Sequence, residues 1–243
     1  MRFESIRIVL VGTSHPGNIG SSARAMKNMG FEQLYLVAPE NRPNQNSYEL
    51  AAGADDVLQG AIITDSLTQA LADCHVVFAT SARARELSIP GDTPHACAQR
   101  IAQHTDDTRI ALVFGRERTG LTNAELLQCH YHVHIPSAPT FSSLNLAQAV
   151  QIITYEIRMA LLSPPATVFL KQDQRASAHE VEQFYTHLAE VLTQINFIRT
   201  AHPKRLLQRL RRMFNRIQIE AMEVNLLRGM LTQIQRACTK ESS

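Results

Sequence analysis

The sequence lacks several features that would assign it to common classes of protein. No apolar stretch in its 243 residues approaches the roughly 20 residues that a membrane-spanning helix needs. Its four cysteines include no C-x-x-C pair, which favours reduced thiols over a disulfide framework or a zinc site. The N-terminus runs directly into a strand pattern, so we expect no signal peptide. These absences predict a cytoplasmic protein with no membrane segment.

Two common nucleotide-binding fingerprints are also missing from the first glycine-containing loop, residues 12–24. A Walker loop needs a lysine after its second glycine, and Gly17 is not followed by one. The glycines of this loop also lack the G-x-G-x-x-G spacing of dinucleotide-binding folds. What remains is the start of a helix, with Arg24 about one turn inside it. The free N–H groups of a helix start and an arginine can hold a phosphate, but an ordinary turn with a solvated arginine fits the loop equally well.

Charge is unevenly distributed, although the net charge is only +2. Residues 1–163 hold 12 Lys and Arg against 15 Asp and Glu, and residues 164–243 hold 12 against 7, which together make the totals of 24 and 22. The C-terminal part is therefore basic. Such asymmetry indicates an acidic partner, nucleic acid among others.

Alternating strand and helix patterns predict an α/β domain over residues 1–163, with a mostly parallel sheet and helices on both faces. We expect strands at 6–11, 34–37, 62–64, 75–79, 109–114 and 131–135, and helices at 19–29, 50–54, 67–72, 94–104 and 144–162. The last helix is apolar almost all round, so we expect it to be buried. Residues 164–177 are predicted to form a linker and residues 178–243 a small all-helical unit.

Ligands of such sheets bind beside the carboxyl ends of strands. After the first loop, the loops at these ends are 80–85, 115–121 and 136–145. Loop 80–85 offers small hydroxyl residues and two arginines, and it is equally consistent with an ordinary polar loop. Three charges beside Gly115, which allows close approach to the backbone, favour a functional role for the next loop. In the last loop we expect Ser142 or Ser143 to cap the following helix.

Three alternating histidines, His130, His132 and His134, share one face of a predicted strand. Three imidazoles on one face can bind a metal. No acidic or cysteine partner stands beside them at a helical spacing, so we interpret them as residues of a half-exposed strand and expect no metal.

Three short motifs occur in order at the strand-end loops. They are N-x-G-x-x-x-R (Asn18, Gly20, Arg24), F-G-x-E-x-x-G-L (Phe114, Gly115, Glu117, Gly120, Leu121) and S-L-N-x-x-x-A (Ser143, Leu144, Asn145, Ala149). Together they resemble the SPOUT superfamily of methyltransferases over about the first 160 residues. The resemblance is to the branch that methylates ribose 2′-hydroxyls, and closest to the bacterial TrmJ type that acts on tRNA. Many relatives carry a serine where this chain has Ala147, which we interpret as a subfamily difference.

The resemblance implies a fold that residue spacing does not reveal, a deep trefoil knot at the C-terminal end of the α/β domain. It implies S-adenosylmethionine as cofactor, held by Thr80, Ser81, Ala82, Gly115, Ile135, Ser142, Ser143 and Leu144. It also implies a homodimer, with the long helix from Leu144 as a candidate for the contact. No metal is needed, because a sulfonium is already an activated leaving group.

The resemblance assigns activation of the ribose hydroxyl to Arg24. A guanidinium is a poor base. The sequence therefore leaves open whether Arg24 accepts the proton or stabilises the alkoxide. Asn18 and Glu117 are expected to orient the loops and the substrate, and Asn145 to support the cofactor loop.

A basic stripe is predicted on the helical unit. Its members, at helical spacing, are Arg205, Arg209, Arg212 and Arg216. The apolar residues expected to pack on the other side are Leu206, Leu207, Leu210, Met213, Phe214 and Ile217. No acidic residue lies between 199 and 216, so the stripe is predicted to bind RNA phosphates rather than form a merely solvated face.

Three functions remain, in order of preference. The first is methylation of a ribose 2′-hydroxyl in tRNA, on a pyrimidine at position 32 of the anticodon loop if the TrmJ likeness extends to detail. The second is the same reaction on ribosomal RNA. Several relatives that act on ribosomal RNA carry an extra domain before the α/β domain, whereas this chain has a basic unit after it, which favours the first function. The third is a non-catalytic RNA-binding protein of this fold, against which the intact Arg24 argues.

Overall fold

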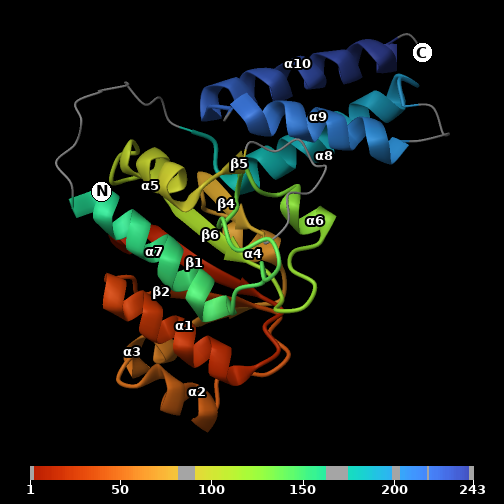
Figure 1. The fold of residues 1–243 in the computed structure, drawn as a ribbon. Helices are drawn as coiled ribbons and strands as arrows, with labels where there is room; N and C mark the ends of the chain where they lie inside the picture. Colours follow the sequence, from red (N-terminus) through yellow and green to blue (C-terminus); the bar gives the residue numbers. More distant parts are fainter. Residues whose placement is uncertain (1–2, 82–90, 163–174, 199–202, 218, 241–243) are drawn as a thin grey trace.

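The structure is a computed structural model of the 243-residue chain and describes residues 3–81, 91–162, 175–198, 203–217 and 219–240 (Figure 1). Its strands are β1 (Ile6–Val11), β2 (Gln33–Val37), β3 (Ile62–Thr64), β4 (Val76–Thr80), β5 (Gly91–Asp92), β6 (Ile110–Phe114) and β7 (Tyr131–Val133). They form one parallel sheet in the order β3-β2-β1-β6-β4-β7-β5. The predicted α/β class and parallel sheet are confirmed.

Helices cover both faces of this sheet. They are α1 (Pro16–Met29), α2 (Gln45–Ala51), α3 (Asp55–Gln59), α4 (Leu67–Leu71), α5 (Pro94–Ala102), α6 (Asn123–Leu126), α7 (Leu146–Leu162), α8 (Ala178–Gln194), α9 (Pro203–Ile217) and α10 (Ala221–Lys240). No helix in the described part of the chain has the length and apolar character needed to cross a membrane.

The central strand β1 shows why the sheet needs helices on both sides. All six of its residues are buried. Ile8 and Leu10 point into a core that they share with α1, α5 and α7, while Val9 and Val11 enter a separate core with α4 and α6. This alternation is the expected period of a strand, and burial on both faces explains the uninterrupted apolar sequence.

The three C-terminal helices build a third core on the sheet face that carries α4 (Figure 1). Backbone N–H groups of Ala178 and His179 donate to the carbonyls of Cys74 (2.6 Å) and Ala72 (3.2 Å). Ala176, which the sequence places in a linker, donates to Ile219 O at 3.1 Å. The end of that segment therefore belongs structurally to the helical unit; the division into 1–163, 164–177 and 178–243 stays a prediction.

Helix α7 differs from its prediction. It begins at Leu146, and it is not buried all round: Tyr155, Met159 and Leu162 are 49%, 45% and 60% exposed. The helix packs on α1 and α5 with one side only, because it is the outermost layer on that face (Figure 1). Its outer side is an apolar stripe.

Positive backbone angles explain another difference. The single helix predicted at 50–54 is interrupted, because Ala52 and Gly53 have φ values of 46° and 95° and separate α2 from α3. The predicted stop after α1 is confirmed: Gly30 has φ 82° and donates its N–H to Lys27 O at 3.1 Å. The short elements β5 and α6 were not predicted. The trefoil knot stays a prediction, since residues 82–90 lie outside the described part of the chain.

Candidate active site

The carboxyl ends of β6, β4 and β7 stand side by side and bring the predicted cofactor loops together. The Thr80 hydroxyl donates to Val113 O at 3.1 Å, and Ser81 N donates to Val133 O at 3.1 Å. The end of β4 is thus fixed between the neighbouring strand ends. The predicted cofactor residues at this edge are Thr80, Ser81, Gly115 and Ile135; Ala82 lies outside the described residues.

The loop before α7 folds back on itself. Phe141 N donates to Ala138 O at 2.9 Å, and the Ser137 hydroxyl donates to Ser142 O at 3.0 Å. This turn leaves Ser142 and Ser143 exposed at the start of the helix.

The cap of α7 is Asn145 rather than Ser142 or Ser143, so that prediction was wrong. The Asn145 side-chain oxygen accepts from Ala147 N at 2.9 Å, which is the usual N-cap hydrogen bond. A cap must immediately precede the first helical turn, and the two serines stand too far before Leu146 to reach it.

One residue from each motif joins a continuous hydrogen-bond chain. Asn145 Nδ2 donates to Asn18 Oδ1 at 3.0 Å, and Asn18 Nδ2 donates to Glu117 Oε1 at 2.9 Å. These three residues come from α1, from the loop after β6 and from the cap of α7. The structure thus connects the three residues expected to orient the loops, although they are 99 and 127 positions apart along the chain.

Glu117 is the end point of this chain and also closes the start of α1. It accepts from Ser14 N and Ser14 Oγ, both at 3.2 Å, and from His15 N at 3.4 Å. Partial burial raises the pKa of Glu117, but hydrogen bonds from Asn18 and the backbone outweigh it and hold the pKa below its ordinary value. An ionised carboxylate of the protein therefore occupies the helix start where the sequence allowed a phosphate.

Arg24 stands apart from these contacts. Because α1 begins at Pro16, Arg24 lies eight residues into the helix, about 12 Å along its axis, rather than one turn in. Its side chain is exposed and makes no hydrogen bond or ion pair with the described part of the chain. The structure does not bring Arg24 to the Glu117–Asn18–Asn145 chain, and leaves its guanidinium available to a ligand.

The motif glycines are required by close contacts within the protein. A Cβ atom at Gly20 would lie 2.0 Å from Ser47 O, so Gly20 lets α2 pack against α1. A Cβ at Gly115 would lie 2.3 Å from Gly120 C, because the loop folds back on itself. The close approach expected at Gly115 is therefore made at least partly by the chain's own backbone.

The three histidines have different surroundings. His130 is buried: its Nδ1 accepts from Val77 N, and its own N donates to Val77 O, both at 2.9 Å. Burial lowers the pKa of His130 to about 4, so its ring is neutral. His132 and His134 are half-buried, as predicted. Among the described residues, no three His, Cys, Asp or Glu side chains gather where they could hold a metal ion.

The chemistry of the loop residues fits S-adenosylmethionine. Ile135 and Leu144 are half-buried apolar side chains suited to an adenine ring, and the exposed hydroxyls of Ser142 and Ser143 directly precede Leu144 in the chain. Two small cavities lie elsewhere, between the helical unit and the α/β domain, and an open groove lies at the amino edge of the sheet. None of these three includes a predicted cofactor residue.

The predicted basic stripe lies on α9. Arg205, Arg209 and Arg216 are exposed and Arg212 is half-exposed, and none of the four is paired with a described residue. On the apolar side, Phe214 packs edge-on against Phe184, with 4.9 Å between ring centroids. Met213, predicted to pack there as well, is 43% exposed, because its position turns toward the border of the stripe.

Sequence reasoning missed two groups of residues. The bidentate pair between Arg116 and Glu125, with both contacts at 3.1 Å, fixes the loop after β6 to α6. Asn215 and Arg211 contact other elements from a third side of α9. The only sequence signal for Arg211 and Asn215 was that these polar residues lie on neither the basic stripe nor the apolar side of the helix.

Known proteins identify the class to which this fold and site belong. The profile of the SpoU rRNA Methylase family matches residues 5–155, and that of the tRNA methyltransferase TrmJ, C-terminal domain, matches residues 179–243. An AdoMet-bound rRNA methyltransferase from Sinorhizobium meliloti shares the fold, with a TM-score of 0.52 at 23% identity over 67% of this chain and 59% of that one.

Two relatives match almost the whole chain. It is 50% identical over 239 residues to the tRNA (cytidine/uridine-2'-O-)-methyltransferase TrmJ of Photorhabdus laumondii, which covers 98% of this chain and 99% of that protein. TrmJ from Z. mobilis ZM4 superposes with a TM-score of 0.84 at 33% identity, over 94% of this chain and 98% of that one. The chain therefore belongs to the SpoU methylase family and, within it, to the TrmJ group.

Proposed function

We propose that the protein transfers the methyl group of S-adenosylmethionine to a ribose 2′-hydroxyl of tRNA. The observation that carries this proposal is the Glu117–Asn18–Asn145 chain, which joins all three motifs at the carboxyl edge of the sheet. It occurs in a chain that is 50% identical, over nearly its full length, to a tRNA (cytidine/uridine-2'-O-)-methyltransferase.

The cofactor would be held by the loops after β4, β6 and β7 and by the residues before α7. When bound, it supplies a methyl group on a sulfonium, which needs no metal to leave. The hydrogen-bond chain ties the loop after β6 and the cap of α7 to α1, the helix that carries Arg24. The proposed cofactor residues are Thr80, Ser81, Ala82, Gly115, Ile135, Ser142, Ser143 and Leu144.

Arg24 is the proposed catalytic residue. Negative charge develops on the 2′-oxygen as the hydroxyl loses its proton to solvent water. This oxygen then forms its bond to the methyl carbon while the bond between that carbon and the sulfonium sulfur breaks. A guanidinium keeps its own proton at neutral pH, so we assign Arg24 the stabilisation of this charge. Its exposed, unpaired side chain supports this role, since no described residue competes for it.

Methyl transfer tests the proposal directly. Labelled methyl from S-adenosylmethionine should appear on unmodified tRNA with the wild type and fall by at least a hundredfold with Arg24→Ala, whereas Arg24→Lys keeps the charge and some activity. Digestion and mass spectrometry should locate the label on the ribose of a pyrimidine at position 32. Label on ribosomal RNA alone would favour the second function, and label on neither RNA would favour a binding protein.

The stripe Arg205, Arg209, Arg212 and Arg216 is the proposed RNA-binding surface. Replacing the first three by alanine should weaken tRNA binding and reduce the slope of log K against log salt by about 2 to 3, since each lost phosphate contact removes about 0.7 to 0.9. Affinity for S-adenosylmethionine should not change. The triple lysine variant is the matched control, because it keeps the charges. Unchanged tRNA affinity in the alanine variant would contradict the assignment.

We also propose that the protein is a cytoplasmic homodimer. The exposed apolar stripe on α7, formed by Tyr155, Met159 and Leu162, supports a contact with a second copy, since such stripes mark interaction surfaces. The buried thiols of Cys74, Cys97 and Cys129 form no disulfide within the described part of the chain, which suits a reducing compartment.

A further inference from the structure

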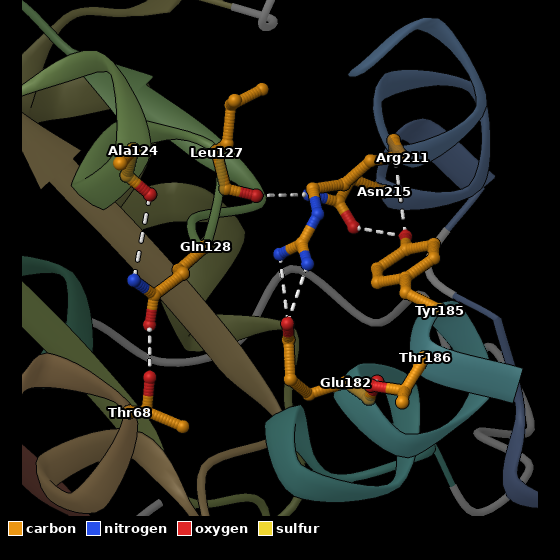
Figure 2. A network of polar contacts seen from close by, with 9 residues as sticks. All are labelled: Thr68, Ala124, Leu127, Gln128, Glu182, Tyr185, Thr186, Arg211 and Asn215. Atoms are coloured by element: carbon orange, nitrogen blue, oxygen red, sulfur yellow. Dashed lines mark hydrogen bonds and ion pairs between the residues drawn. The ribbon is translucent and has the colours of Figure 1, made fainter. Parts of the chain in front are cut away.

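A side-chain amide of α9 contacts the α/β domain. Asn215 Nδ2 donates to Leu127 O at 3.0 Å and to Cys129 O at 3.4 Å (Figure 2 shows the first). Leu127 and Cys129 are buried residues of the α/β domain. An amide with two N–H groups satisfies both carbonyls, and its loss would leave them without these donors.

The segment that Asn215 contacts lies between two of the proposed cofactor loops. Residues 127–130 connect α6 to β7. On one side, the Arg116–Glu125 pair ties α6 to the loop after β6. On the other side, Ile135 follows two residues after the end of β7, and His130 fastens the segment to β4. A helix docked on this segment is therefore placed relative to both loops.

A buried tyrosine sets the orientation of the amide. The Tyr185 hydroxyl, from α8, has two acceptors on α9: Asn215 Oδ1 at 2.6 Å and Arg211 O at 3.1 Å. The shorter contact holds the amide oxygen toward Tyr185, so the N–H groups of the amide point at the α/β domain. Burial raises the pKa of Tyr185 above its usual range, which keeps the hydroxyl protonated as a donor. The Arg211 guanidinium lies 4.5 Å from the centre of the tyrosine ring and binds both oxygens of Glu182, at 2.8 and 2.5 Å (Figure 2).

Three sides of α9 have three different partners. At about 100° per residue, Arg211 and Asn215 lie roughly a quarter-turn from the arginine stripe, while Phe214 faces the core of the helical unit. The contacts of Asn215 therefore set the direction in which the stripe points. We infer that Asn215 is a positioning residue for methyl transfer, which fixes the RNA-binding stripe relative to the cofactor loops. The inference rests on the proposed function.

Removing the amide should affect turnover more than binding. Asn215→Ala keeps the arginines, and Phe214 still holds α9 in its own core. Bound tRNA would then present its ribose to the cofactor less often. We expect kcat/KM for tRNA to fall roughly tenfold, mostly through kcat, as for the loss of a well-aligned hydrogen-bond pair.

The test is a cycle of full-length variants, with kcat and KM measured on unmodified tRNA and the dissociation constant of S-adenosylmethionine measured separately. Asn215→Ala is combined with the triple alanine variant of Arg205, Arg209 and Arg212. If Asn215 acts through the stripe, it should cost much less than tenfold in the background that lacks the stripe. Asn225→Ala, at an exposed asparagine of α10, is the matched control and should leave all constants unchanged.

Equal losses from Asn215→Ala with and without the stripe would overturn the inference, because they indicate a merely structural role. So would a parallel loss of S-adenosylmethionine affinity. If Asn215→Ala does not fold, Tyr185→Phe removes the hydroxyl that contacts Asn215 and Arg211 O but keeps the amide, and should give a smaller effect of the same pattern. If the wild type methylates tRNA and Asn215→Ala has the same kcat/KM, this inference alone is overturned. If the wild type does not methylate tRNA, the inference falls together with the proposed function.

Discussion

Replacing Glu117 by glutamine should break a hydrogen-bond chain whose direction is fixed at both ends by backbone N–H groups. At one end, Ala147 N donates to Asn145, so the amide of Asn145 must turn its N–H toward Asn18. Asn18 in turn must donate to Glu117. At the other end, two N–H groups from the loop before α1 also donate to Glu117. Every donor points at this residue, and only a group without donors of its own satisfies them all.

The cost follows from these contacts. A glutamine amide places an N–H group against Asn18 in one orientation and against Ser14 in the other. Either way, at least one charge-assisted hydrogen bond is replaced by two opposed donors, which costs about 2 kcal/mol for a half-buried group. The loops of all three motifs should loosen, and the affinity for S-adenosylmethionine should fall about tenfold or more.

Urea unfolding followed by circular dichroism, together with cofactor titration, checks both numbers. Glu40→Gln is the matched control: it makes the same chemical change at an exposed residue near the same loop, and should stay within about 0.5 kcal/mol of the wild type. A Glu117→Gln variant as stable as this control, with unchanged cofactor affinity, would refute the argument that donor direction is fixed.

Two further predictions concern packing and pH. Gly20→Ala should lower the free energy of unfolding by about 2 to 3 kcal/mol, because its Cβ would lie 2.0 Å from Ser47 O. Gly229→Ala, in α10, has open space around its Cβ and should raise the free energy of unfolding by up to about 1 kcal/mol. Urea unfolding that changed the stability of both variants in the same direction would contradict this prediction. Because burial lowers the pKa of His130 to about 4, its contribution to stability is complete above pH 6.5 and falls as the pH drops toward 4, with about 2 kcal/mol lost by pH 5. His130→Asn should remove that part of the pH dependence, and an unchanged slope between pH 7.5 and 5 would contradict the assignment.

Continuous patterns made much of the fold predictable. The apolar runs of β1 and β6 and the glycine after α1 were correctly placed, because each signal lies within a few adjacent residues. The outer side of α7 was not predictable from its composition, since apolar residues all round a helix do not specify which neighbours cover them. The periodicity of a sequence describes one helix or strand at a time, whereas the burial of its surface depends on which other elements pack against it.

The sequence predicted which residues form the site but not how they are arranged in space. The motifs singled out Asn18, Glu117 and Asn145, but their mutual hydrogen bonds join positions about a hundred residues apart and exist only in the folded chain. Asn215 carried even less signal. A single asparagine on a helix has no period, and its partners are backbone carbonyls, which every residue has.

The carbonyls on which the helical unit docks impose an order on synthesis. They belong to residues 72–74 and 127–129, which leave the ribosome well before α8 and α9. Domains generally fold as units as they emerge, N-terminal first. The nascent chain would therefore complete its cofactor side while the arginine helix is still being made. A chain that stops early would have the loops for the methyl donor and no fixed surface to present the nucleic acid to them.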